Sequence, residues 1–148
     1  MEKSIISEQL IILDLDADNK NTIIEAISQL AFEHGYISDL GQFIETVKQR
    51  EEQFSTAIGY GIGMPHGKSN TVLSPFISFA RLKIPFYWDE EELVKYVFLI
   101  GVPEADVVLH LKFISQLSKK LLDDDYRNAL ADFETTKQVE AHLSQIEI

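Results

Sequence analysis

A short glycine-rich segment contains the residues of this chain that are best suited to chemistry. Residues 59–69 read Gly-Tyr-Gly-Ile-Gly-Met-Pro-His-Gly-Lys-Ser and hold four of the chain's seven glycines. Glycine weakens regular elements, so such a cluster indicates that another group must approach the main chain closely. Pro65 biases Met64 towards an extended conformation and stiffens the exposed turn on which His66 is expected. An imidazole among unshielded amides predicts a site that handles an anion.

Spacing excludes two nucleotide-binding motifs that this segment superficially matches. The phosphate-binding loop of nucleotide hydrolases ends as residues 67–69 do, but its first glycine would fall on Ile62. The dinucleotide fingerprint Gly-x-Gly-x-x-Gly also fails, because its third glycine would fall on Met64 or His66. The anion is therefore not expected to be bound by either nucleotide motif.

His110 is the second residue with candidate chemistry. It lies near the start of an expected helix, and its neighbours at helical spacing, Val107 and Ile114, put it on the inner face or at its edge. The positive end of the helix dipole favours a neutral imidazole there, which could hydrogen-bond near an anion. The alternative is a core histidine with purely structural partners.

No metal ion or other cofactor is expected. A zinc site needs three or four ligands, the chain has no cysteine, and no further histidine stands at ligand spacing from His66 or His110. His34 and His142 are expected at helix ends, where they would cap the helix or contact solvent.

Length and composition limit the class of protein. A chain of 148 residues with 45% hydrophobic content predicts one domain, residues 1–148, with a real core. No apolar run approaches the roughly 20 residues that span a bilayer, and no signal peptide follows Met1, so no direct membrane insertion is expected. A net charge of −11 argues against nucleic acid as a partner. The absence of cysteine fits a reducing compartment, and a cytoplasmic location is expected.

The apolar patterning predicts the elements that must position these residues. Strands are expected at residues 10–13, 75–84 and 93–102, and a strand and turn at 56–64. One helix should be capped by Asn21 or Thr22 and stop at Gly35, and a second should be capped by Ser38 or Asp39 and carry Arg50. A long helix should follow residues 103–106, and shorter ones should cover about 126–133 and 135–144. This order predicts an α/β fold: a single-domain sandwich with a mixed β-sheet of about five strands flanked by helices.

The residues around His66 resemble the active-site signature of a known family. The segments 49–51 (Gln-Arg-Glu), 55–59 (Ser-Thr-Ala-Ile-Gly) and 61–67 (Gly-Ile-Gly-Met-Pro-His-Gly) are similar to those of enzyme IIA domains of the fructose–mannitol class. These domains belong to the bacterial phosphoenolpyruvate-dependent sugar phosphotransferase system. The order of the later elements extends the resemblance over essentially the whole chain. The family often has alanine where Gly63 stands and a branched aliphatic residue where Met64 stands.

The resemblance implies a role for each candidate residue. His66 would be the phosphoryl acceptor and would take the group from the histidine-containing phosphocarrier protein. It would then pass the group to a cysteine of an enzyme IIB partner, and the chain would thereby indirectly serve a membrane enzyme IIC. A neutral imidazole suits this task because it is nucleophilic near pH 7. Arg50 would stabilise the phosphoryl charge, and His110 would orient the ring or the phosphoryl group. Thr56 would donate a hydrogen bond, with Ser55 as the second choice.

Other interpretations remain open at this point. A regulatory enzyme IIA-like protein, acting as a phosphorylation-state-dependent interaction module, would keep His66 as well. An unrelated α/β module could bind a small anionic ligand without any covalent step. Arg50 could also be a surface arginine paired with Glu51 or Glu52.

Overall fold

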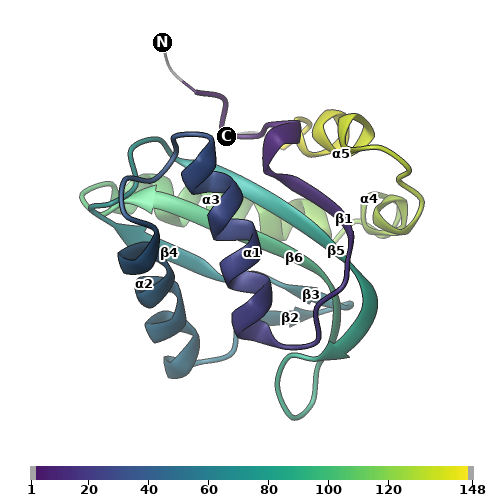
Figure 1. Ribbon diagram of the computed structural model, residues 1–148. Coiled ribbons are helices and arrows are strands. Elements are labelled where there is room, and N and C mark those ends of the chain that lie inside the picture. The colour runs from purple at the N-terminus through teal and green to yellow at the C-terminus, as the bar shows by residue number, and fades with distance from the viewer. Residues whose placement is uncertain (1–2, 147–148) are drawn as a thin grey trace.

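The computed structural model describes residues 3–146, in which one mixed β-sheet lies between two layers of helices (Figure 1). The strands run in the order β1 (Ile11–Leu15), β5 (Phe76–Tyr87), β6 (Leu93–Pro103), β3 (Ile62–Gly63) and β2 (Ala57–Gly59), and β4 (His66–Ser69) also pairs with β6. The helices are α1 (Lys20–Glu33), α2 (Leu40–Gln53), α3 (Val107–Leu121), α4 (Asp124–Asn128) and α5 (Thr136–Leu143), with short 3-10 turns η1 (Glu8–Leu10) and η2 (Ala129–Ala131). The predicted α/β sandwich is confirmed, with six strands in place of about five.

Two hydrophobic cores lie on opposite faces of the sheet. Along β6, Val97 and Leu99 pack with α1 and α2, whereas Phe98 and Ile100 pack with α3, α4 and α5. Successive side chains of a strand point to opposite faces, so a continuous apolar run is what a strand covered on both sides requires. Figure 1 shows the same division, with α1 and α2 in front of the sheet and α3 behind it.

The ends of the first two helices follow local capping chemistry. Gly35 adopts a left-handed backbone (φ 80°) just after α1, as the stop signal predicted. The predicted start of α1 is wrong by two or three residues, because the side chain of Asn19 accepts the hydrogen bond from the Thr22 amide. Asp39 caps α2 in the predicted way, by accepting from the Gln42 amide.

The segment from Ala57 to Ser69 contains three short strands, which explains the additional strand. β2 and β3 form an antiparallel hairpin whose tip, residues 59–61, has three successive positive φ angles. β4 then pairs in parallel with β6, with His66 opposite Ile100. The prediction of His66 on an exposed turn is wrong: the residue opens a strand, and its exposed fraction is 8%. Because β4 is stabilised by pairing with β6, more than thirty residues later, no local pattern in the sequence indicates that residues 66–69 form a strand.

Strand β5 extends three residues beyond its predicted end. Pro85 lies inside the strand, at the point where the register with β6 shifts between Arg81 and Phe86. Proline has no amide hydrogen to give to a ladder, so it is tolerated where the ladder is interrupted. Over residues 3–146, no helix has the length and apolar content that crossing a membrane requires. The single-domain prediction for residues 1–148 reaches beyond the described residues at both ends and stays a prediction.

Candidate functional site

His66 is held in one orientation by the backbone around it. The Ile100 amide donates to the Pro65 carbonyl (3.1 Å), which fixes the start of β4 on β6. The His66 Nδ1 atom lies 2.9 Å from the Met64 carbonyl oxygen. A carbonyl can only accept, so Nδ1 carries the hydrogen and donates it, and the lone pair of the neutral ring is on Nε2.

The electrostatic surroundings keep this imidazole neutral near pH 7. Burial lowers the pKa of His66 most strongly, and the Arg50 guanidinium lowers it further. The bond to Met64 and the Glu51 carboxylate act in the opposite direction, but the net pKa is below the usual value. A neutral ring with a free Nε2 lone pair is nucleophilic.

His110 lies beside His66, as the resemblance implies. It occupies the first turn of α3, which Asp106 caps by accepting from the Leu109 amide (3.0 Å). The two imidazole rings meet edge to face, with centroids 5.2 Å apart. Burial first, and then the neighbouring His66, Lys68 and Arg50, lower the pKa of His110 to about 4. Both rings are therefore neutral at physiological pH, so neither adds a positive charge to the site.

Arg50 reaches the same place from the last turn of α2. Its Nη1 donates to the Phe54 carbonyl (3.0 Å), which turns the side chain around the end of the helix. Within residues 3–146, Arg50 forms no ion pair with Glu51 or Glu52, and Glu51 pairs instead with Lys20 (3.5 Å). The guanidinium can therefore bind an anion without first breaking an ion pair with Glu51.

Gly67 explains how α2 comes close enough for this arrangement. A Cβ atom at Gly67 would lie 2.9 Å from Cγ2 of Val47 and 3.1 Å from Cε1 of Phe43, both on α2. Side chains essentially never tolerate the shorter of these distances, so any larger residue would push α2 away from β4. The glycine after His66 is needed for packing, and through packing it sets the position of Arg50.

Two hollows meet at the histidine pair, and Arg50, His66 and His110 line both of them. One, of about 340 Å³, is polar and opens between α2 and β4; its other lining residues are Thr46, Gln49, Gln53, Gly67 and Lys68. The other, of about 380 Å³, opens towards β2 and α3; its other lining residues are Ser55, Thr56, Ala57, Ile58, Met64, Ile114 and Ser118. The three predicted residues thus come together, and a group on His66 would be reachable from either hollow.

The two predicted hydroxyl donors already have acceptors. The Thr56 hydroxyl donates to Glu51, which also accepts from the Thr56 amide (2.8 Å). The Ser55 hydroxyl donates to Asp89. Both residues line the second hollow, but their hydroxyl hydrogens are engaged elsewhere. A direct role of Thr56 towards a phosphoryl group stays a prediction, and it would require this bond to break.

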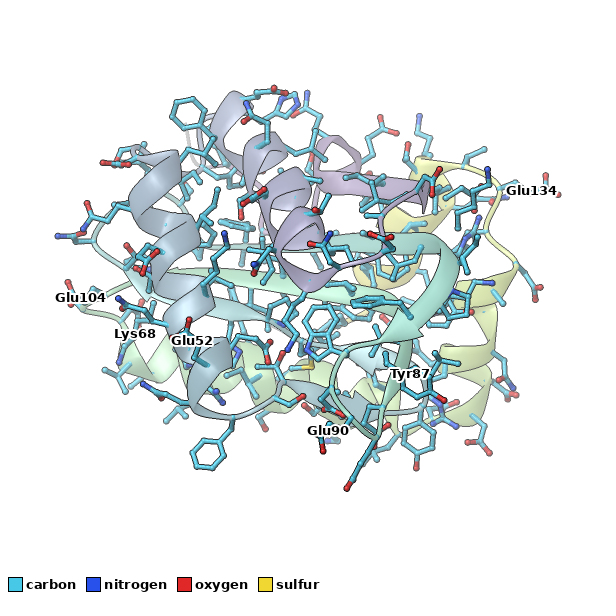
Figure 2. The ribbon with its side chains drawn as sticks, turned by 60° about the horizontal axis from the view of Figure 1, so that its bottom comes forward. Glu52, Lys68, Tyr87, Glu90, Glu104 and Glu134 are labelled. Atoms are coloured by element: carbon cyan, nitrogen blue, oxygen red, sulfur yellow. The ribbon has the colours of Figure 1, made fainter. Side chains whose placement is uncertain are left out.

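Lys68 is a site residue that the sequence reasoning missed. It is exposed (Figure 2) and lines the polar hollow with His66. Residues two apart in a strand lie on the same face, so recognising residues 66–69 as a strand would have placed Lys68 beside His66. Its ammonium group adds a second positive charge near the histidine pair, in a protein whose net charge is −11.

The remaining histidines lie away from this site. His34 is the C-terminal cap residue of α1, as predicted. His142 stacks on Tyr126 with ring centroids 3.9 Å apart, and its Nε2 lies 2.9 Å from the Tyr126 carbonyl. Its role is packing between α4 and α5, which differs from the capping or solvated role predicted for it. Among residues 3–146, no group of three or more histidines and acidic residues could hold a metal ion.

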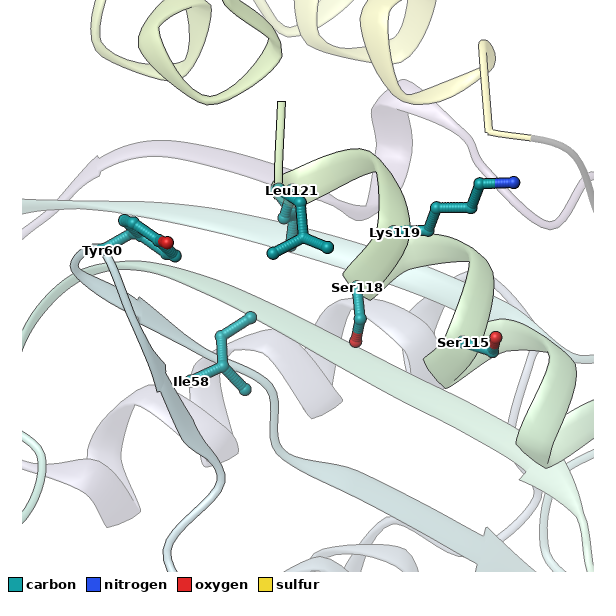
Figure 3. Close-up of a pocket in the computed structure, with 7 residues that line it drawn as sticks. Ile58, Tyr60, Ser115, Ser118, Lys119 and Leu121 are labelled. Carbon is teal, nitrogen blue, oxygen red and sulfur yellow. The ribbon is translucent and has the colours of Figure 1, made fainter. Parts of the chain in front are cut away.

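A third hollow, of about 370 Å³, lies between α3 and the β2–β3 hairpin (Figure 3). It shares Ile58 and Ser118 with the second hollow. Tyr60 closes its far end, and its ring is held by Arg127, whose Cζ lies 3.8 Å from the ring centre. An apolar trough therefore leads from the histidine pair to the tip of the β2–β3 hairpin.

Comparison with known proteins places this site in a family. The family model described as "Phosphoenolpyruvate-dependent sugar phosphotransferase system, EIIA 2" matches residues 4–146. The "PTS system fructose-specific EIIA component" of Haloferax volcanii is 32% identical over 140 residues, which cover 93% of this chain and 91% of that protein. The "PTS system fructose-specific EIIABC component" of Mycoplasma pneumoniae is 32% identical over 114 residues, 76% of this chain but 16% of that longer protein.

A solved structure of similar overall shape adds a regulatory relative. Nitrogen regulatory protein IIA-Ntr from Neisseria meningitidis superimposes with a TM-score of 0.86 and 27% identity, over 94% of this chain and 96% of that one. Family model, relatives and fold agree with the resemblance inferred from the residues around His66. The chain belongs to the EIIA 2 family of the phosphoenolpyruvate-dependent sugar phosphotransferase system, whose EIIA components are phosphotransferases that work through a phosphohistidine.

Proposed function

We propose that His66 is the phosphorylated residue and that Nε2 is the atom modified. The observation that carries this proposal is the bond from Nδ1 to the Met64 carbonyl, which leaves the lone pair on Nε2. In the first step this lone pair attacks the phosphorus of the phosphohistidine on the histidine-containing phosphocarrier protein. A new N–P bond forms as the donor's N–P bond breaks, and its electron pair returns to the donor's imidazole.

The second step passes the group to a cysteine of an enzyme IIB partner. The cysteine thiolate attacks phosphorus, an S–P bond forms, and the electron pair of the breaking bond returns to Nε2 of His66. The name of the Mycoplasma relative, which combines A, B and C components, supports an enzyme IIB partner. The protein would act in the cytoplasm and indirectly serve a membrane enzyme IIC.

The positive groups around His66 are suited to stabilising the negative charge of a transferred phosphoryl group. Phosphoryl transfer depends mainly on positioning and on stabilising charge on the equatorial oxygens. The Arg50 guanidinium offers planar paired donors, and Lys68 offers a single ammonium group from the polar hollow. His110, neutral and edge-on to His66, would orient the phosphoryl group by a hydrogen bond.

The surface around the site suits docking with other proteins. Large apolar side chains are exposed on the elements that line the hollows, namely the end of α2, the β2–β3 hairpin and α3: Phe54, Ile58, Tyr60, Val107, Val108, Leu111 and Leu122. Val108 and Phe54 are the most exposed of these, at 77% and 76%. Exposed apolar side chains beside a polar site are typical of protein interaction surfaces. The trough of Figure 3 would receive a partner's side chain next to the transferred group.

The test is to load the protein and map the modified residue. Incubation with phosphoenolpyruvate, enzyme I and the histidine-containing phosphocarrier protein should add one acid-labile phosphoryl group, which mass spectrometry should locate on His66. The variant His66→Gln should remain unmodified, and His142→Gln should be modified like the wild type. Absence of the group, or its presence on another residue, would refute the proposal.

A regulatory role is the second candidate, and the likeness to the nitrogen regulatory protein favours it. In that case His66 would still be phosphorylated, but the phosphorylation state would control binding to another protein. Transfer to a purified enzyme IIB domain separates the two functions. A loaded protein that transfers to no such domain would support the regulatory function.

A further inference from the structure

Glu51 is a buried carboxylate at the back of the site whose role the proposed mechanism leaves open. Its exposed fraction is 8%, although it is the residue next to Arg50 on α2. An ionised carboxylate is costly to bury unless several donors satisfy it. Here one oxygen accepts from the Thr56 amide (2.8 Å) and pairs with Lys20 (3.5 Å), and the other accepts from the Thr56 hydroxyl.

Two further hydrogen bonds connect Thr56, which is bound to Glu51, with the imidazole of His66. The Thr56 carbonyl accepts from the Met64 amide (3.0 Å), and the Met64 carbonyl accepts from Nδ1 of His66 (2.9 Å). A continuous series of hydrogen bonds therefore connects Glu51 to the ring through two backbone segments. Each bond fixes the place of the next residue, so the last one fixes the direction in which Nε2 points.

The anchoring of Glu51 also closes the turn after α2. Thr56 lies five residues after Glu51, and the intervening turn contains Phe54, whose carbonyl holds the Arg50 guanidinium. Lys20, the ion-pair partner of Glu51, packs over the Trp88 ring at 5.0 Å from its centre, which ties the cluster to the core. The same carboxylate is thus connected to the segments that hold both the His66 ring and the Arg50 guanidinium.

We propose that Glu51 is a positioning residue for phosphoryl transfer, acting through Thr56 and Met64 on the His66 ring and through the segment that follows α2 (residues 54–55) on Arg50. The proposal rests on the proposed function of His66. Glu51 touches no transferred atom; it keeps Nε2 and the guanidinium aligned. Small misalignments of reacting groups reduce rates strongly, so loss of Glu51 should slow the transfer step on the order of ten- to a hundredfold.

The decisive variants are Glu51→Gln and Thr56→Val, because each keeps the size of the side chain. Single-turnover phosphorylation at saturating donor should slow in both, most in Glu51→Gln, while the donor concentration for half-maximal rate stays unchanged. The conservative variant Thr56→Ser, which keeps the hydroxyl, should restore a rate near that of the wild type. Glu52→Gln, an exposed change one residue along, is the matched control and should be neutral.

A second measurement needs no partner protein. It distinguishes an effect of Glu51 on the orientation of the His66 ring from an effect on the stability of the fold. Imidazole ¹⁵N and ¹H signals of the isolated protein report the Nδ1 hydrogen bond and the pKa of His66. Because the Glu51 charge raises that pKa, Glu51→Gln should lower it further and weaken the Hδ1 signal, whereas Glu52→Gln should change neither.

The outcomes are distinguishable. A lower melting temperature for Glu51→Gln with unchanged imidazole signals and unchanged transfer rate per folded molecule would overturn the positioning role. If the wild type itself is not phosphorylated, the proposed function fails, and the imidazole signals of the isolated variants still decide whether Glu51 holds the ring.

Discussion

Gly67→Ala is the change whose effect can be worked out most directly from the structure. The added Cβ would lie 2.9 Å from Cγ2 of Val47 and 3.1 Å from Cε1 of Phe43, and both side chains are fully buried on α2. Gly67 does not adopt a left-handed backbone, so the penalty is steric alone. Overpacking of this kind costs about 1–3 kcal/mol. For a domain of this size each kcal/mol lowers the melting temperature by about 3 °C, so we expect a loss of roughly 3–9 °C.

The same substitution should also slow phosphorylation, because relief of the contact moves α2, and with it Arg50, away from His66. Gly41→Ala is the matched control, since Gly41 lies on the same helix and its nearest neighbour would be an Asp39 oxygen at 3.8 Å. Alanine is the better helix former, so this control should be neutral or slightly stabilising, by up to about 1 kcal/mol. Thermal unfolding and single-turnover kinetics measure both effects. A Gly67→Ala protein as stable as the wild type would refute the close approach of α2 to β4.

Three further results are expected. Arg50→Lys keeps the charge but loses the paired donors, so phosphorylation should slow about tenfold or more in rapid-quench experiments; an unchanged rate would remove the guanidinium from the mechanism. His110→Ala should still accept the phosphoryl group but pass it on poorly, and a wild-type rate of transfer to an enzyme IIB domain would contradict this. The pKa of His110 is about 4 in the folded protein and near 6.5 when unfolded, so the folded state binds fewer protons between these values. Stability to urea should therefore be full above pH 6.5 and fall as the pH drops towards 4, and His110→Asn should flatten the decline.

Elements with a strong local signal were predicted well. The apolar run at 93–102 forms β6, and the stripe from Val107 to Leu121 forms α3, because burial on a covered sheet or along one helix face leaves a periodic pattern. Thr135 caps α5, and Gln138 completes a capping box. By contrast, the helix expected at 126–133 is divided into α4 and a 3-10 turn, since only short stretches there face the core.

The residues that form the site were predicted more accurately than their arrangement in space. The resemblance brought His66, His110 and Arg50 together, and the structure places all three around the same hollows. The strand character of β4 was missed because its stabilising partner is β6, far away in the chain. The attachment of Thr56 to Glu51 was missed for a different reason: side-chain hydrogen bonds have no periodicity that a sequence could reveal.

The low exposure of the His66 ring has a consequence for a carrier that must wait between its two encounters. Phosphoimidazoles are lost when water attacks phosphorus, and the His66 ring, with an exposed fraction of 8%, leaves water fewer directions of approach than a fully exposed ring would. A loaded molecule would therefore survive long enough to diffuse from donor to acceptor. The same low exposure means that a partner must approach a phosphoryl group on His66 through one of the two hollows that meet there.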